Sequence, residues 1–315
     1  MNILVTGGLG AVGSVLVPEL EKRGHNVFVI DLDTHHHAEN YARVDVGEFR
    51  QLEKLWTGSG WDRGYLNSPR KFDMVFHLAA EFGRWNGEDY YETLWKTNAV
   101  GTKNILKMQE KEGFQTVYFS TSEVYGDFRD IMVENVMETT EVKQLNDYAL
   151  SKWVNEQQVL NSASMYGTES VRVRLFNSYG PGEYYSPYRS VICLFAYRAL
   201  KNLPYIVYKN HSRTSIFITD VVNTLANIAN NFKSSEVYNI GGTDYHDIEQ
   251  ISSMILNYLG KDDSLVSYQE SEKLTTKDKK VDSSKAIADL NHSVTVNLEE
   301  GIAKTIEWMK KVYNL

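Results

Sequence analysis

The chain has 315 residues, of which 42% are hydrophobic, and its formal net charge at pH 7 is −8. These values predict an ordinary globular fold of one large or two medium domains, and they argue against a nucleic-acid-binding surface. Cys193 is the single cysteine and no apolar run approaches the roughly 20 residues of a membrane span, so we expect no membrane partner and a reducing, cytoplasmic setting.

Short apolar runs alternate with helical patterns through the first 180 residues. Strands are expected at 2–6, 26–31, 73–78, 115–120 and 170–176, and helices at 11–23, 48–56, 89–112 and 147–165. Such alternation predicts an α/β fold with a doubly wound parallel sheet. A stretch at 57–70 that contains Gly, Ser, Asn and Pro predicts a surface insertion.

The pattern changes after Gly180-Pro181-Gly182. A tyrosine-rich loop follows (Tyr184, Tyr185, Tyr188), which is either a lid or a packing element. Further on we expect a helix at 189–201, a strand at 236–240 and an amphipathic helix at 298–312. The sequence therefore predicts a Rossmann-type domain over 1–178, with a return segment at about 214–242, and a smaller α/β domain over 179–315.

A glycine-rich turn joins the first strand to the first helix. Gly7, Gly10 and Gly13 lie where a dinucleotide-binding unit needs a tight turn and close approach of the backbone to a pyrophosphate. The helix that follows offers free N–H groups to that anion. Asp31 closes the second strand, where a carboxylate bonds the adenosine ribose hydroxyls and repels a 2′-phosphate. The pattern favours NAD over NADP.

A tyrosine and a lysine four residues apart, Tyr148 and Lys152, share one face of the helix at 147–165. The same spacing recurs at Tyr197/Lys201 and Tyr205/Lys209, but only the first pair follows a hydroxyl-rich strand end, which carries Thr121. A tyrosine has a pKa near ~10, so acting as a base at neutral pH requires a fall of roughly 3 units. The charges of Lys152 and of an oxidised nicotinamide supply such a fall, and Thr121 orients the substrate hydroxyl.

These features together resemble the extended short-chain dehydrogenases/reductases, specifically the NAD-dependent sugar-nucleotide epimerase/dehydratase family. The resemblance covers nearly the whole length. The segments that carry it are Thr6–Gly13, Asp31, Asp45-Val46, His77–Ala80, Asn98, Thr121, Tyr148, Lys152, Arg174–Pro181, Arg213 and Asp220-Val221.

The resemblance implies a role for each matching residue. The cofactor side would consist of Gly7, Gly10, Ala11, Val12, Gly13, Asp31, Asp45, Val46, Leu78, Ala79, Ala80, Tyr148 and Lys152, with Asn98 in a mainly structural role. The nucleotide-diphosphate sugar would contact Thr121 and Asn177, with Arg213 and Arg189 on its diphosphate and Arg84 as a further anion contact. The helices at 89–112 and 147–165 would form a homodimer interface.

The family oxidises a sugar hydroxyl, usually at C4, and its branches differ in the fate of the ketone. Ser122 and Glu123 follow Thr121, as in GDP-mannose-type 4,6-dehydratases and UDP-glucuronate decarboxylases. We favour 4,6-dehydration with Glu123 as the base that removes the C5 proton, although Ser122 is a weaker acid than the usual Asp.

Other outcomes stay open on the sequence alone. An epimerase needs no further acid or base. A decarboxylase needs a cation for the C6 carboxylate. In glucuronate enzymes an Arg often follows the Tyr-Gly-Pro motif directly, whereas this chain has Gly182-Glu183 there. A non-enzymatic NAD-binding regulator would lack the catalytic residues that this chain has. The triplet His35-His36-His37 is interpreted as a solvated loop, and no metal is expected.

Overall fold

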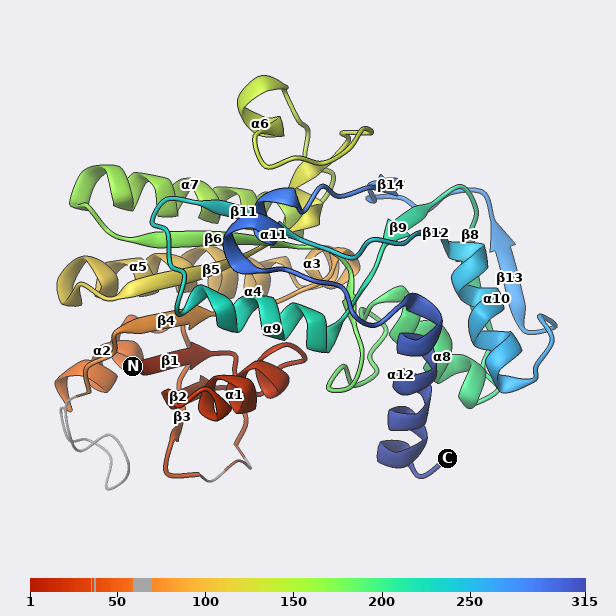
Figure 1. Cartoon of the computed structure of the whole chain (residues 1–315), viewed down its shortest axis with the longest axis horizontal. Helices are drawn as coiled ribbons and strands as arrows, with labels where there is room; N and C mark the ends of the chain where they lie inside the picture. The colour runs from red at the N-terminus through yellow and green to blue at the C-terminus, as the bar shows by residue number, and fades with distance from the viewer. Residues whose placement is uncertain (35, 37, 59–69) are drawn as a thin grey trace.

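The computed structural model describes residues 1–34, 36, 38–58 and 70–315 (Figure 1). Within them, seven parallel strands form a central sheet in the order β11-β6-β5-β4-β1-β2-β3. The strands are β1 (Asn2–Thr6), β2 (Asn26–Asp31), β3 (Tyr41–Arg43), β4 (Met74–His77), β5 (Gln115–Thr121), β6 (Ser170–Leu175) and β11 (Val237–Ile240). The fold class predicted from the alternating pattern is confirmed.

Helices cover both faces of this sheet because its strands are apolar on both sides. Along β1, Ile3 and Val5 belong to one buried cluster and Leu4 to another. The first cluster includes residues of α1 (Gly13–Lys22), α9 (Ile218–Ile228) and α11 (Ser284–Leu290), and the second includes residues of α2 (Phe49–Thr57) and α5 (Gly101–Glu112). Helix α7 (Asp147–Tyr166) packs against α5.

The predicted helix at 89–112 is wrong as a single element. The chain instead forms α3 (Arg84–Asp89), α4 (Tyr91–Trp95), a π-helical turn η1 (Lys96–Val100) and then α5. Tyr90 leaves helical geometry at φ −130° and ψ 48°. In the π-helical turn, the buried Asn98 amide bonds the backbone of Glu81, which a regular helical spacing does not reveal.

The rest of the chain forms a smaller group of elements on one side of the sheet (Figure 1). Its helices are α8 (Val191–Leu200), α10 (Ile248–Leu259) and α12 (Leu298–Tyr313). Its short strands are β7 (Ser178–Tyr179), β8 (Tyr205–Tyr208), β9 (Ser212–Thr214), β10 (Ile216–Phe217), β12 (Tyr245–Asp247), β13 (Val266–Gln269) and β14 (Asp278–Lys279). Two further short helices, η2 (Ser122–Tyr125) and α6 (Val136–Thr139), follow β5.

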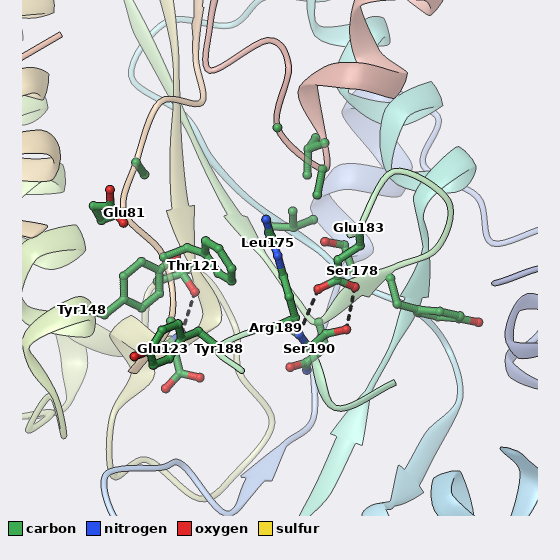
Figure 2. Close-up of a pocket in the computed structure, with 18 of the residues that line it drawn as sticks. Glu81, Thr121, Glu123, Tyr148, Leu175, Ser178, Glu183, Tyr188, Arg189 and Ser190 are labelled. Atoms are coloured by element: carbon green, nitrogen blue, oxygen red, sulfur yellow. Dashed lines mark hydrogen bonds between the residues drawn. The ribbon is translucent and has the colours of Figure 1, made fainter. Parts of the chain in front are cut away.

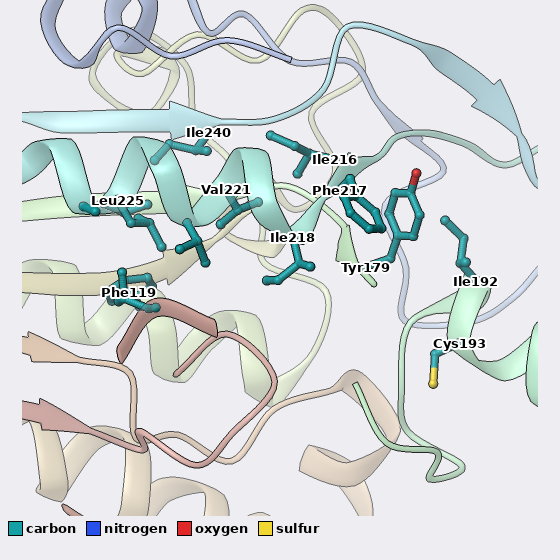
Figure 3. Packing of buried hydrophobic residues seen from close by; sticks show 14 of the residues in the cluster. Phe119, Tyr179, Ile192, Cys193, Ile216, Phe217, Ile218, Val221, Leu225 and Ile240 are labelled. Carbon is teal, nitrogen blue, oxygen red and sulfur yellow. The ribbon is translucent and has the colours of Figure 1, made fainter. Parts of the chain in front are cut away.

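One hydrophobic core joins the central sheet to this smaller group. Figure 3 shows it running from Phe119 on β5, past Val221 and Leu225 on α9, to Tyr179 and Cys193. The two parts are therefore packed together, and a cavity between them has defined walls.

Two sequence expectations fall partly outside the described residues. The predicted insertion at 57–70 lies there except for its ends. Of the three adjacent histidines only His36 is described, and its ring lies 4.7 Å from that of Tyr41. The described residues include no cluster of three or more potential metal ligands, and none of their helices is long and apolar enough to cross a membrane.

Candidate active site and cofactor cleft

A cavity of about 690 Å³ lies beyond the carboxyl ends of the central strands, where ligands of such sheets bind. Among the described residues, those predicted from sequence to form the site line this cavity, with the exception of Asn98. They are Gly7, Gly10, Ala11, Val12, Gly13, Asp31, Asp45, Val46, Leu78, Ala79, Ala80, Arg84, Thr121, Ser122, Glu123, Tyr148, Lys152, Asn177, Arg189 and Arg213.

Asn98 needs a correction as a cofactor contact. It is buried, and its side chain accepts a hydrogen bond from the Glu81 N–H and donates to the Glu81 carbonyl and to Ser151, at 2.9–3.0 Å. Asn98 therefore braces the loop after β4 against α7, which agrees with a structural role.

The glycine-rich turn has room for a backbone only. Gly7 has φ +68°, and a Cβ added there would lie 2.7 Å from the Ala79 nitrogen. A Cβ on Gly13 would lie 2.5 Å from the Gly7 oxygen. Helix α1 begins just after this turn without a side-chain cap. The N–H groups of Ser14 and Val15 donate to the carbonyls of Gly10 and Val12, at 2.9 and 3.2 Å, so the turn is held by its own backbone. No side chain covers the positive end of the helix dipole, which is the environment that a pyrophosphate needs.

The Asp31 carboxylate is held at the edge of the cavity by two backbone donors. Its Oδ2 accepts from the Leu9 N–H at 2.9 Å, and its Oδ1 accepts from the Leu32 N–H at 2.7 Å. This geometry links the end of β2 to the glycine turn. A carboxylate so placed fits the ribose of an adenosine, and together with the turn it meets the requirements of NAD.

Tyr148 and Lys152 occupy successive turns at the start of α7, where Asn146 caps the helix by accepting from the Ala149 N–H at 2.8 Å. The Lys152 ammonium lies 6.0 Å from the centre of the Tyr148 ring and donates to the Phe119 carbonyl at 2.8 Å. Burial lowers the pKa of Lys152 to about 7.

The Tyr148 phenol is buried beside the end of β5. Burial raises its pKa, a hydrogen bond to Thr121 lowers it, and the Glu123 charge raises it further. The structure itself thus holds Tyr148 protonated. The fall that proton abstraction requires must come from the positive charge that NAD and Lys152 bring when the site is loaded.

Glu123 forms a buried ion pair with Lys279 of β14, a residue that the sequence reasoning missed. Burial alone would raise the pKa of the Glu123 carboxyl, but the Lys279 ammonium and two nearby guanidinium groups lower it to about 2. Those groups belong to Arg84 and Arg213. Burial lowers the pKa of Lys279 to about 8 despite the Glu123 charge. Lys279 lies in the charged run 277–280, which has no sequence signature of a site.

Arg84 is partly neutralised by a second carboxylate from the C-terminal part of the chain. Its guanidinium donates to Glu272 at 2.9 Å, and the Trp85 indole donates to the same carboxylate at 3.0 Å. Glu272 was not singled out from the sequence. The two ion pairs, with Arg213, give three cations and two carboxylates at this end of the cavity among the described residues.

Arg213 lies on β9, and Asn177 lies in the connection between β6 and β7. The Arg213 guanidinium donates to the carbonyls of Ser212 and Lys277 at 2.9 and 2.6 Å and to the Thr275 hydroxyl at 3.1 Å. Burial lowers its pKa to about 10, so it stays charged at neutral pH. Asn177 has φ +30° and donates to the Thr214 carbonyl at 3.2 Å.

Arg189 lies across the cavity from Tyr148, on the segment before α8 (Figure 2). Its guanidinium stacks 4.2 Å above the Phe82 ring, and its buried Nε has no hydrogen-bond partner among the described residues. Nearby, Glu183 accepts from the Ser190 N–H and hydroxyl at 2.9 and 2.7 Å. Burial raises the pKa of Glu183. Glu183 therefore fixes the segment that carries Arg189.

One part of the tyrosine-rich loop is a packing element, and another part lines the cavity as a lid would. Tyr185 stacks on Tyr197 at 3.9 Å, and its N–H donates to the Tyr313 hydroxyl at 2.8 Å, so this part is a packing element. Tyr188 lines the cavity and donates to Asp89 at 2.9 Å. Only Tyr188 lies where a lid would contact a ligand.

The fold and this site define a Rossmann-type, NAD-dependent enzyme of the short-chain dehydrogenase/reductase type. The chain belongs to the NAD dependent epimerase/dehydratase family, whose sequence profile matches residues 3–241. NAD is its cofactor, as the glycine turn and Asp31 predicted.

Known proteins similar to this chain span several activities. It is 29% identical to a UDP-N-acetyl-alpha-D-glucosaminuronate decarboxylase of Bacillus cytotoxicus, over 99% of this chain and 98% of that protein. It is 26% identical to a dTDP-glucose 4,6-dehydratase of Escherichia coli, over 98% and 92%. The solved UDP-glucose 4-epimerase of Thermotoga maritima with UDP-glucose is 26% identical and superposes with a TM-score of 0.86, covering 99% and 100% of the two chains. The chain is thus an NAD-dependent enzyme that modifies nucleotide sugars.

Proposed function

We propose that this enzyme oxidises the C4 hydroxyl of a nucleotide-diphosphate uronic acid and decarboxylates the resulting ketone. The oxidation rests on the convergence of Tyr148, Thr121 and Lys152 at the junction between the cofactor cleft and the charged end of the cavity. Bound NAD supplies the hydride acceptor and later the hydride donor. Residues 1–178, with the return segment at 214–242, would hold NAD, and the remainder would hold the sugar nucleotide.

Each residue of this group has one task. Thr121 orients the substrate hydroxyl, and Tyr148 removes its proton as the C4–H bond breaks. Lys152 contributes positive charge beside the Tyr148 phenol. Its ammonium donates a hydrogen bond to the Phe119 carbonyl, which holds it 6.0 Å from the centre of the Tyr148 ring. Arg213 and Arg189 hold the diphosphate, for which guanidinium forks are well suited.

The ion pair of Glu123 and Lys279 is the observation that favours decarboxylation over the other reactions. A β-keto acid loses carbon dioxide without a base: the C5–C6 bond breaks, its electrons move to the C4 oxygen, and C5 then takes a proton. The protein needs only cations that recognise the C6 carboxylate. Lys279 and Arg84 provide them, which answers the absence of an Arg after Tyr179-Gly180-Pro181.

The same pair argues against Glu123 as a proton-abstracting base. Its pKa of about 2 makes it a weak base, and Ser122 supplies no acid for a leaving C6 hydroxyl. One observation still favours 4,6-dehydration as the second candidate: Lys279, with a pKa of about 8, lies against Glu123 and would serve as the acid that Ser122 cannot provide. C4 epimerisation requires neither group.

A panel of nucleotide sugars separates these reactions. Purified protein with NAD is incubated with UDP-glucuronate, UDP-glucose, dTDP-glucose and GDP-mannose, and the products are weighed by mass spectrometry. Loss of carbon dioxide from UDP-glucuronate is the expected result. Loss of water from a neutral hexose would establish the dehydratase instead, and an isomer of unchanged mass would establish the epimerase.

We also propose a homodimer formed through α5 and α7. Helix α7 exposes Leu150, Val154, Leu160 and Met165, an apolar content that is unusual for a solvent-facing helix of a monomer. Met165 is 70% exposed. A second copy of the same surface would cover these side chains through a two-fold interface.

A further inference from the structure

A histidine that the proposed reaction does not use lines the cavity at the connection between β8 and β9 (Figure 1). His211 is 1% exposed. Its carbonyl accepts from the Ile248 N–H at 3.0 Å, and its ring lies edge-on to that of Tyr208, with the ring centres 6.2 Å apart. The backbone and the neighbouring ring therefore fix the position of the imidazole.

The hydrogen-bond partner of one ring nitrogen fixes the tautomer. His211 Nδ1 lies 2.6 Å from the Lys209 carbonyl oxygen, which only accepts, so Nδ1 carries the hydrogen. Burial lowers the pKa of His211 and the Arg213 charge lowers it further, against the Lys209 bond, so the ring is neutral. Nε2 is then a hydrogen-bond acceptor, and it is buried with no partner among the described residues.

The chemistry of the ligand limits what can satisfy this acceptor. Arg213, two residues further on, is the residue to which we assign the diphosphate, but ionised phosphate oxygens carry no hydrogen to donate. The reacting sugar must lie at Tyr148, whereas Tyr208 and Ile206 of β8 line the cavity beside His211. The donor group of a sugar nucleotide that lies next to the diphosphate on the nucleoside side is a ribose hydroxyl.

We propose that His211 Nε2 accepts a hydrogen bond from a ribose hydroxyl of the substrate nucleotide, and that the enzyme thereby selects ribonucleotide over deoxyribonucleotide sugars. This inference rests on the proposed function only in taking a nucleotide-diphosphate sugar as the substrate. It favours UDP- or GDP-type substrates over dTDP-type substrates. A deoxyribose would leave the buried His211 Nε2 without a hydrogen-bond donor, which costs binding free energy.

The test measures binding of free nucleotides by calorimetry with the NAD-loaded enzyme. UDP and GDP are compared first, and the tighter of the two is then compared with its 2′-deoxy and 3′-deoxy analogues. We expect the 2′-deoxy analogue to bind about tenfold more weakly to the wild type, because the 2′-hydroxyl is the group that a deoxyribonucleotide lacks. Weaker binding of the 3′-deoxy analogue alone would overturn the selection of ribonucleotides. Equal binding of all three would overturn the proposal while leaving the reaction, which product analysis tests separately, untouched.

Two variants isolate the nitrogen concerned. His211→Asn keeps an amide N–H near the position of Nδ1 for the Lys209 carbonyl and lacks Nε2, so it should bind the three nucleotides alike. His211→Gln places an amide oxygen near the position of Nε2 and should restore part of the discrimination. His25→Asn is the matched control, since His25 has two unpaired ring nitrogens among the described residues and does not line the cavity. Undiminished discrimination by His211→Asn would contradict the proposal.

Discussion

Lys279 and Glu123 form a buried ion pair that joins strand β14 to the turn after β5, directly beside Tyr148. They are 156 positions apart in the chain. The pair brings a cation from the smaller group of elements into contact with the catalytic end of the Rossmann sheet. If Lys279 recognises the substrate carboxylate as we propose, the pair couples that recognition to the packing of the two parts.

Replacing Lys279 with Met should have two effects. The free energy of unfolding should fall by about 3 kcal/mol, because the buried Glu123 carboxylate loses its ion-pair partner and keeps only the more distant charges of Arg84 and Arg213. Turnover of UDP-glucuronate should fall at least about a hundredfold, since the substrate carboxylate loses its cation. Urea unfolding and product assays measure the two separately. Lys280→Met is the control, because Lys280 is exposed and adjacent. Equal activity of the two variants would remove Lys279 from the site.

Tyr148→Phe should abolish turnover, with a fall of at least about a thousandfold, because no other hydroxyl replaces the proton acceptor. Binding of NAD and of UDP should change little, since the ring remains. The matched control is Tyr197→Phe, which stands in the same four-residue spacing to a lysine but does not line the cavity. Comparable losses in both variants would contradict the assignment of Tyr148 by its position in the cavity.

The buried Lys152 predicts how stability depends on pH in the cofactor-free protein. Its pKa is about 7 in the folded state, against the ordinary value of 10.5. Between those two pH values the unfolded chain binds a proton at this lysine that the folded chain does not, so its contribution to stability rises with pH. The wild type should gain up to about 1.4 kcal/mol per pH unit relative to Lys152→Met. If the free energies of unfolding of the two proteins changed equally with pH between pH 7 and 10, this prediction would be contradicted.

Asp31 sets the choice of cofactor in our account. Asp31→Ser should weaken NAD binding about tenfold and reduce the preference for NAD over NADP, because the ribose loses its carboxylate partner and a 2′-phosphate is no longer repelled. Fluorescence titrations with both cofactors measure this. Asp33→Ser is the control, as Asp33 does not line the cavity. An unchanged NAD/NADP ratio in Asp31→Ser would exclude this role.

The proposed dimer predicts that a charge on α7 separates the two copies. Leu160→Glu combined with Met165→Glu should halve the mass in light scattering and leave the circular dichroism spectrum unchanged, because both side chains are exposed in the single chain. A monomeric wild type would rule out the interface from the start.

Local sequence signals were sufficient for much of this site. The strands at 2–6 and 26–31 appear with the predicted bounds, and the glycine turn, Asp31 and the Tyr148/Lys152 pair depend on spacings within one or two elements. Parallel topology then places their ends on one cavity. That is why the cofactor and the family could be predicted from the residues alone.

What escaped prediction depends on contacts between distant segments. Lys279 and Glu272 come from a charged stretch whose composition is typical of a solvated surface. Only the folding of that stretch over Glu123 and Arg84 buries Lys279 and pairs Glu272 with Arg84. The missed strand β3 has three residues and follows a histidine-rich loop, so it shows too little periodicity. The sequence around His211 does not indicate a binding role, because that role depends on a buried ring nitrogen that has no partner among the described residues.

The central claim is tested most directly by running the reaction with UDP-glucuronate and NAD in deuterium oxide and following it by NMR and gas analysis. The account predicts release of carbon dioxide and a product that carries one solvent deuterium at C5, with hydrogen rather than deuterium at C4 because the hydride returns from the cofactor. An intact C6 carboxylate in every product of UDP-glucuronate would contradict decarboxylation. In a parallel reaction with UDP-glucose, loss of water with solvent deuterium at C5 would establish dehydration.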